Sequence, residues 1–170
     1  LTIKAQDPKA PLVLLCEHAS NEVPPPLSIN ENDHPWLQTH WAWDIGTATI
    51  IKTVTEQLGC AGVLANFSRL VCDPNRPIND DTFIRQEVEG HPLSFNCDLD
   101  EKEIQRRIET YYRPYHQAVD AMIRNRLLVN SNFLIFSVHS FTPNYLGNKR
   151  DVEVGVLFDV YDKEAAVLYN

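Results

Sequence analysis

Three short apolar runs, separated by segments with helical periodicity, constrain the fold more than any other feature of this chain. The runs span residues 11–16, 61–67 and 133–138, and their length and continuity are typical of strands buried on both faces. Residues 44–58 carry apolar side chains at helical spacing up to Gly59, and residues 98–130 are also strongly helical. Strands that alternate with helices predict an α/β fold, with helices on both faces of one sheet.

The rest of the chain adds weaker elements. We expect a fourth strand at 152–158, a helix from Asp162 onward, a long surface loop after the first strand and an irregular segment over 80–96. In the helix over 98–130, Asp98 or Asp100 is the expected N-cap, and Pro114 should kink or split the helix. A chain of 170 residues suits one domain, and we expect a single domain over 1–170.

Charge and hydropathy exclude several partners. The net charge is −8 and the 15 basic residues are dispersed, so we expect no nucleic-acid partner, which would need clustered Lys and Arg. No apolar run approaches the roughly 20 residues that cross a bilayer, so we expect no membrane partner. Four cysteines without CxxC spacing favour reduced thiols and a cytoplasmic location. Nothing in the sequence indicates the oligomeric state.

Two histidines occupy equivalent places, His18 just after the first predicted strand and His139 just after the third. Neighbouring parallel strands would bring them to one edge of the sheet, where such folds place their sites. A catalytic zinc takes three N or O ligands, and Asp44 is the best third candidate, with Glu22 or His40 as substitutes. The alternative is structural: two hydrogen-bonded histidines at strand ends, and Asp44 as a helix N-cap.

The segment 68–77 contains a second group of polar residues, Arg69, Asp73, Asn75 and Arg76, of which the last two lie between prolines. Arg binds carboxylates in a bidentate manner, and Asn adds a donor and an acceptor, so the loop could hold an anionic substrate. The alternative is a surface loop in which Arg76 pairs with Asp73. A catalytic Cys16 is disfavoured because it sits in a buried strand, and no GxSxG, P-loop or dinucleotide motif is present.

Five motifs, in this order, resemble the N-formylglutamate amidohydrolase family. They are Leu15-Cys16-Glu17-His18-Ala19-Ser20-Asn21, His40-Trp41-Ala42-Trp43-Asp44-Ile45-Gly46, Ser68-Arg69-Leu70-Val71-Cys72-Asp73-Pro74-Asn75-Arg76-Pro77, Pro114-Tyr115-His116 and His139-Ser140-Phe141-Thr142-Pro143. The resemblance implies a three-layer α/β/α fold of the phosphorylase/hydrolase-like kind, with a mixed, largely parallel sheet, related to zinc carboxypeptidases. It also implies hydrolysis of N-formylglutamate, a late step of histidine degradation.

The resemblance also implies roles for individual residues. His18, Asp44 and His139 would bind one divalent metal ion, with Zn²⁺ as the first expectation. Asn75 and Arg76 would bind the carboxylate of a small N-acyl amino acid, together with Ser140, and Arg69 would polarise the scissile carbonyl.

The general base of related enzymes is a glutamate near the C-terminus. This chain stops at Asn170, before such a segment, so we expect it to be truncated there. Glu17 and Glu22 are the carboxylates nearest to His18 in sequence, and we assign Glu22 as the catalytic one. Two other functions stay open: a carboxypeptidase-like or cell-wall amidase, and a non-catalytic carboxylate-binding module that lacks the base.

Overall fold

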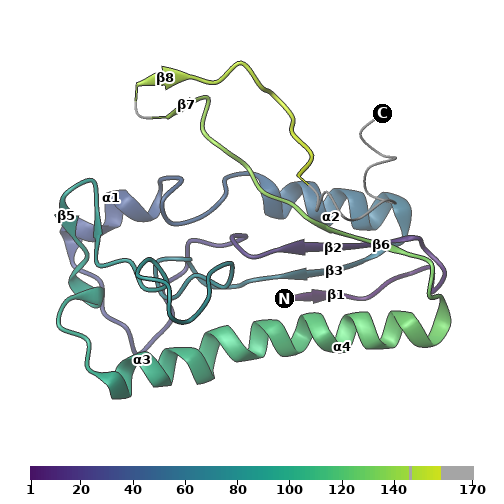
Figure 1. Ribbon diagram of the computed structural model, residues 1–170, viewed down its shortest axis with the longest axis horizontal. Coiled ribbons are helices and arrows are strands. Elements are labelled where there is room, and N and C mark those ends of the chain that lie inside the picture. Colours follow the sequence, from purple (N-terminus) through teal and green to yellow (C-terminus); the bar gives the residue numbers. More distant parts are fainter. Residues whose placement is uncertain (146, 158–170) are drawn as a thin grey trace. The chain divides into compact units, whose positions relative to one another are not determined.

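A four-stranded sheet forms the centre of residues 1–140 (Figure 1). The computed structural model describes residues 1–145 and 147–157, and the chain divides into two units after Ser140. The strands of the sheet lie in the order β1 (Thr2–Ile3), β3 (Ala61–Leu64), β2 (Leu12–Cys16) and β6 (Leu134–Ser137). Strand β2 is parallel to β3 and to β6, and only the short β1 runs antiparallel. The predicted mixed, largely parallel sheet is therefore confirmed, while a single domain over 1–170 stays a prediction.

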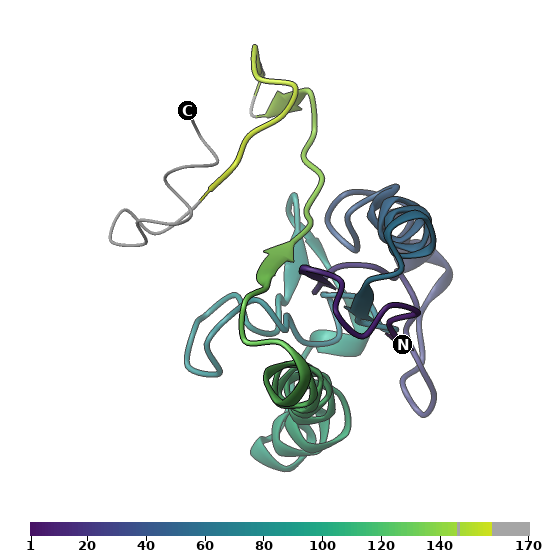
Figure 2. The same ribbon diagram turned by 90° about the vertical axis from the view of Figure 1, so that its right-hand side faces the viewer.

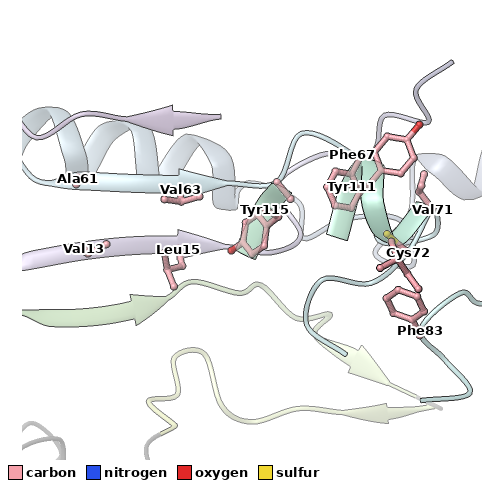
Figure 3. Packing of buried hydrophobic residues seen from close by; sticks show 12 residues of the cluster. Val13, Leu15, Ala61, Val63, Phe67, Val71, Cys72, Phe83, Tyr111 and Tyr115 are labelled. Carbon is pink, nitrogen blue, oxygen red and sulfur yellow. The ribbon is translucent and has the colours of Figure 1, made fainter. Parts of the chain in front are cut away.

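Helices cover both faces of this sheet, as predicted (Figures 1 and 2). Successive side chains of a strand point to opposite faces, and β2 uses this alternation to contact both layers. Val13 and Leu15 pack in the cluster that contains Tyr111 and Tyr115 (Figure 3). Leu14 and Cys16 pack on the other side, in the cluster that contains Ile51 of helix α2 (Thr47–Leu58). The arrangement is three-layered, α/β/α.

The helix predicted over 98–130 is split, and the split lies next to Pro114. It consists of α3 (Glu101–Arg107), a π-helical segment η3 (Ile108–Tyr112) and α4 (Arg113–Val129). Proline has no N–H to donate and its ring crowds the preceding turn, which is a common cause of such an interruption. Asp100 is the N-cap, since its carboxylate accepts a hydrogen bond of 2.8 Å from the backbone N–H of Glu103.

Helix α2 begins three residues later than predicted. Its N-cap is Gly46, and no side chain caps it. Asp44, which one interpretation took as the cap, instead directs its carboxylate away from the helix, as described below. Gly59 ends the helix as predicted, in the left-handed conformation with φ of 62°, which glycine adopts without steric cost.

The segments between the main elements contain short structures that sequence patterns did not predict. These are η1 (Glu31–Asp33), α1 (His34–Leu37), a hairpin of β4 (Glu87–Val88) and β5 (His91–Pro92), and η2 (Ser94–Asn96). The hairpin turn uses Glu89 and Gly90, both with positive φ. That conformation matches the twist of two-residue hairpins, so residues 80–96 are less irregular than expected.

Strand β6 is not buried on both faces, contrary to the prediction for 133–138. Leu134 and Ile135 keep 38% and 45% of their surface exposed. Among the described residues β6 pairs only with β2 and forms the edge of the sheet, so its outer side has no covering strand. An apolar run identifies a strand, but it does not tell how completely the neighbouring layers cover it.

Residues 141–145 and 147–157 form a separate, short unit. It contains a hairpin of β7 (Asn144–Tyr145) and β8 (Asn148–Lys149). The guanidinium of Arg150 lies 5.1 Å from the centre of the Phe141 ring. The strand predicted over 152–158 is wrong for residues 152–157, which form no strand and are exposed, because no described strand pairs with them. Phe158 and the helix predicted from Asp162 lie outside the described residues.

Candidate metal centre

The carboxyl ends of β2 and β6 bring His18 and His139 together, as their sequence positions predicted. The two parallel strands are in register, with Leu15 beside Ser137, so each histidine follows its strand at the same edge. The centres of the two imidazole rings are 5.1 Å apart. His18 is only 2% exposed, whereas the His139 side chain keeps 36% of its surface accessible.

Asp44 is the third residue at this edge, and the structure places it between the two rings. Its backbone N–H donates to the carbonyl of His18 at 2.9 Å, which fixes the start of the segment that leads to α2. Its Oδ2 lies 2.9 Å from Nδ1 of His139 and 3.5 Å from Nδ1 of His18, and it accepts the backbone N–H of Ser140 at 3.2 Å. One potential ligand atom from each of His18, Asp44 and His139 lies within 4.8 Å of the others.

The state of His18 fits a metal ligand better than a structural histidine. Its Nδ1 is buried and has no hydrogen-bond partner among the residues that the structure describes, a costly state for a polar atom unless something else binds there. Its Nε2 is held 2.8 Å from Oδ1 of Asp73. Metal-bound histidines typically donate their second ring N–H to a carboxylate in this way. Two imidazoles and one carboxylate are also a donor set that suits zinc and leaves a position open.

Asp73 is a site residue that the sequence interpretation did not identify. It is buried, and besides His18 it accepts from Nη2 of Arg69 at 2.6 Å and from the backbone N–H of Asn75 at 2.9 Å. The alternative in which Asp73 pairs with Arg76 is wrong, because Arg76 instead lies 4.0 Å from Asp80. The motif contained Asp73, but sequence proximity to Arg76 suggested the wrong partner.

The electrostatics of this pocket favour a cation. Burial raises the pKa of Asp44, but its contacts with His139 and His18 outweigh burial and hold the pKa well below the usual value. The pKa of Asp73 is also lowered, because the contacts with His18 and Arg69 outweigh burial. For His18, burial opposes the charged form, yet the nearby carboxylates of Asp44 and Asp73 raise its pKa. Two ionised carboxylates therefore face the imidazoles, with one permanent positive charge, Arg69, beside them.

Glu17, and not Glu22, is the glutamate that contacts this group. The Oε2 of Glu17 lies 3.6 Å from Nε2 of His139 and accepts the hydroxyl of Ser137. Glu22 is exposed; its backbone carbonyl accepts the N–H of Ser68 at 2.7 Å. The assignment of Glu22 as catalytic stays a prediction. The position of Glu17 directly before His18 was the only sequence signal for its location.

The predicted substrate-binding residues lie on accessible surface. Asn75 and Arg76 are exposed, which leaves both side chains available to a ligand, and Ser140 is partly buried beside Asp44. Arg69 is partly buried and lies 4.0 Å from Oδ1 of Asp44 in addition to its contact with Asp73. Their roles toward a substrate stay predictions.

Two other candidates, His40 and Cys16, are not part of the group of potential metal ligands. The ring of His40, a possible substitute ligand, lies against Trp41 with ring centres 5.0 Å apart. Cys16 donates to the hydroxyl of Thr47, and burial raises the pKa of its thiol to about 11. A thiolate nucleophile is therefore disfavoured at this position, as the sequence indicated.

Comparison with known proteins identifies the family of this chain. The chain matches the N-formylglutamate amidohydrolase family over residues 10–168, and it belongs to that family. It is similar to a gene product of Agrobacterium tumefaciens of known crystal structure, with 33% identity and a TM-score of 0.84. An N-formylglutamate amidohydrolase from Ralstonia eutropha JMP134 shares the fold, with 20% identity and a TM-score of 0.65. No curated protein matches.

The chain is shorter than both solved structures. The match with the Agrobacterium protein covers 95% of this chain but 64% of that one, and the match with the Ralstonia enzyme covers 83% and 56% respectively. Within the described residues, no helix is both long and apolar enough to cross a membrane.

Proposed function

We propose that this chain carries the metal site of an amidohydrolase that cleaves N-formylglutamate, or a related N-acyl amino acid, into a carboxylate and an amine. The observation that supports this most directly is the buried Nδ1 of His18, which lies 3.5 Å from Oδ2 of Asp44 and has no hydrogen-bond partner within the described part of the chain. His18, Asp44 and His139 together form a group of potential metal ligands. Membership of the N-formylglutamate amidohydrolase family supports the reaction class.

His18, Asp44 and His139 would hold one divalent ion, with Zn²⁺ as the first candidate. A bound divalent ion supplies Lewis acidity, which activates water and polarises a carbonyl oxygen. The protein's contribution is orientation: Asp73 fixes the ring of His18, and the backbone N–H of Ser140 fixes the carboxylate of Asp44.

Asn75, Arg76 and Ser140 would bind the substrate. The exposed guanidinium of Arg76 suits a carboxylate such as that of an N-acyl amino acid, and Asn75 adds a donor and an acceptor. Arg69 belongs to the same loop and lies 4.0 Å from Oδ1 of Asp44, where a positive charge would stabilise negative charge developing on the scissile carbonyl. Hydrolysis also needs a group that takes a proton from water and passes it to the leaving nitrogen, and we retain Glu22 as the candidate.

The metal content of the purified protein tests this proposal, with His18→Ala and His139→Ala beside the unaltered chain. His34→Ala is the matched control, because His34 is exposed and lies in α1, outside the cluster. We expect about one equivalent of zinc in the unaltered and control proteins, and none in the other two variants. Release of formate from N-formyl-L-glutamate by the zinc-loaded protein then tests the substrate.

Two results would contradict the proposal in different ways. Full metal occupancy in His139→Ala would show that the ligand assignment is wrong. An unaltered protein that takes up no metal, even after incubation with zinc, would leave the family membership intact and favour the non-catalytic binding module.

A further inference from the structure

Glu17 and Ser137 form a hydrogen-bonded pair on the outer nitrogen of His139. Glu17 follows the last residue of β2, and Ser137 is the last residue of β6. The hydroxyl of Ser137 donates to Oε2 of Glu17, and its oxygen lies 3.0 Å from Nε2 of His139. Glu17 itself is only 9% exposed. We propose that Glu17, acting through Ser137, is a positioning residue that directs Nδ1 of His139 into the metal centre. This inference rests on the proposed metal site.

The argument depends on where the hydrogens can lie. A serine hydroxyl has one hydrogen, and here that hydrogen points to the carboxylate of Glu17, which is an acceptor only. The oxygen of Ser137 must then accept in its contact with Nε2 of His139. Nε2 therefore carries a hydrogen. Nδ1 lies on the other side of the ring, 2.9 Å from Oδ2 of Asp44, so it is the ring nitrogen that would bind a metal ion in place of that contact.

The same arrangement is present at His18. There Nε2 contacts Oδ1 of Asp73 at 2.8 Å, while Nδ1 faces Asp44. Each histidine is thus held at Nε2 by a carboxylate, directly at His18 and through a hydroxyl at His139. Such outer partners fix the ring orientation and the tautomer of metal-bound histidines.

Glu17 is placed to position His139 and not to bind the metal ion itself. Its carboxylate lies on the Nε2 side of the ring, at 3.6 Å, whereas the three candidate ligands meet on the Nδ1 side. Tyr115 is buried next to Glu17: burial, and then the negative charge of Glu17, raise the pKa of its hydroxyl.

The affinity for Zn²⁺, measured by chelator competition, tests the inference in four proteins beside the unaltered chain: Glu17→Ala, Ser137→Ala, the double variant and Glu56→Ala. Glu56 is an exposed glutamate of α2 and serves as the control. We expect Glu17→Ala and Ser137→Ala each to weaken binding about 10- to 100-fold. The double variant should be little weaker than either one, because both remove the same contact. Thermal melting checks that each variant folds.

A second measurement needs no variant. Nitrogen-15 NMR of the histidines in the zinc-loaded chain should show His139 with its hydrogen on Nε2. A hydrogen on Nδ1, or a loss of affinity in Glu17→Ala with none in Ser137→Ala, would overturn the inference. So would variants that bind zinc as tightly as the unaltered chain. If the unaltered chain itself binds no zinc, both the proposed function and this inference fail. If it binds zinc but the variants bind zinc equally tightly, only this inference fails.

Discussion

His18 and Asp73 form a buried hydrogen bond, with 2.8 Å between Nε2 and Oδ1. Both side chains are at most 4% exposed. The contact joins the end of β2 to the 68–77 loop, so it connects the candidate metal centre with the loop that carries Asn75 and Arg76. Because Asp73 also accepts from Arg69, one carboxylate orients a candidate ligand and a candidate catalytic arginine at once.

Asp73→Asn should weaken zinc binding about 10- to 100-fold, the usual effect of removing an outer carboxylate. The amide keeps the size of the side chain but loses the charge that holds both His18 and Arg69. Calorimetric titration with zinc measures this, and Asp81→Asn, at an exposed position of the following turn, is the control. Equal affinities for the two variants would show that His18 needs no carboxylate.

The architecture could be predicted because its signals are local. Apolar runs identified β2, β3 and β6, and Gly59 and Asp100 identified a helix end and a helix start. The exposure of β6 and the missing strand at 152–157 could not be predicted, since both depend on which other segments cover or pair with them.

The candidate site shows the same division. The proximity of His18, Asp44 and His139 could be predicted, because two of them directly follow predicted parallel strands and Asp44 opens the predicted helix between those strands. The structure brings these three residues together. The hydrogen-bond partners of the candidate metal ligands could not be predicted. They depend on the directions in which side chains point beyond the ends of the strands, and the sequence carries little information on these directions. Asp73 contacts His18, which lies 55 positions away in the sequence. Glu17 and Ser137 lie at the ends of the neighbouring strands β2 and β6.

Arg76→Ala should raise the KM for N-formyl-L-glutamate about 10- to 100-fold with a smaller change in kcat, since a charge-assisted hydrogen bond contributes about 1.5–3 kcal/mol. The guanidinium is exposed and its nearest acid, Asp80, is 4.0 Å away, so its removal should not disturb the fold. Steady-state kinetics of the zinc-loaded protein measure this. Arg124→Ala, an exposed arginine of α4, is the control, and an unchanged KM in Arg76→Ala would exclude Arg76 from substrate binding.

Glu103 should make stability depend on pH in the acid range. Hydrogen bonds from Arg106 and then Arg107 lower its pKa from 4.5 to about 2. A carboxylate with a lowered pKa in the folded state stabilises above its unfolded pKa, and this contribution is lost as the pH falls through the folded value. Urea unfolding between pH 5 and pH 2 should therefore show a steeper loss of stability for the unaltered chain than for Glu103→Gln. Parallel curves would contradict this assignment.

Arg106 and Arg107 are neighbours that both bind Glu103, yet their removal should have very different effects. Arg107 is fully buried, and besides Glu103 its guanidinium donates to the side chain of Asn96 and to the carbonyls of Val71 and Phe95. Arg106 is 31% exposed.

Arg107→Ala should reduce the free energy of unfolding by about 3–5 kcal/mol, because buried acceptors lose a charged donor. Arg106→Ala should reduce it by about 1 kcal/mol or less, as expected for an exposed ion pair. Urea denaturation of the two variants at neutral pH measures both values. Both arginines pair with Glu103. A similar loss of free energy of unfolding in the two variants would therefore mean that this ion pair stabilises this part of the fold, and that the contacts of Arg107 with Asn96 and the two carbonyls do not.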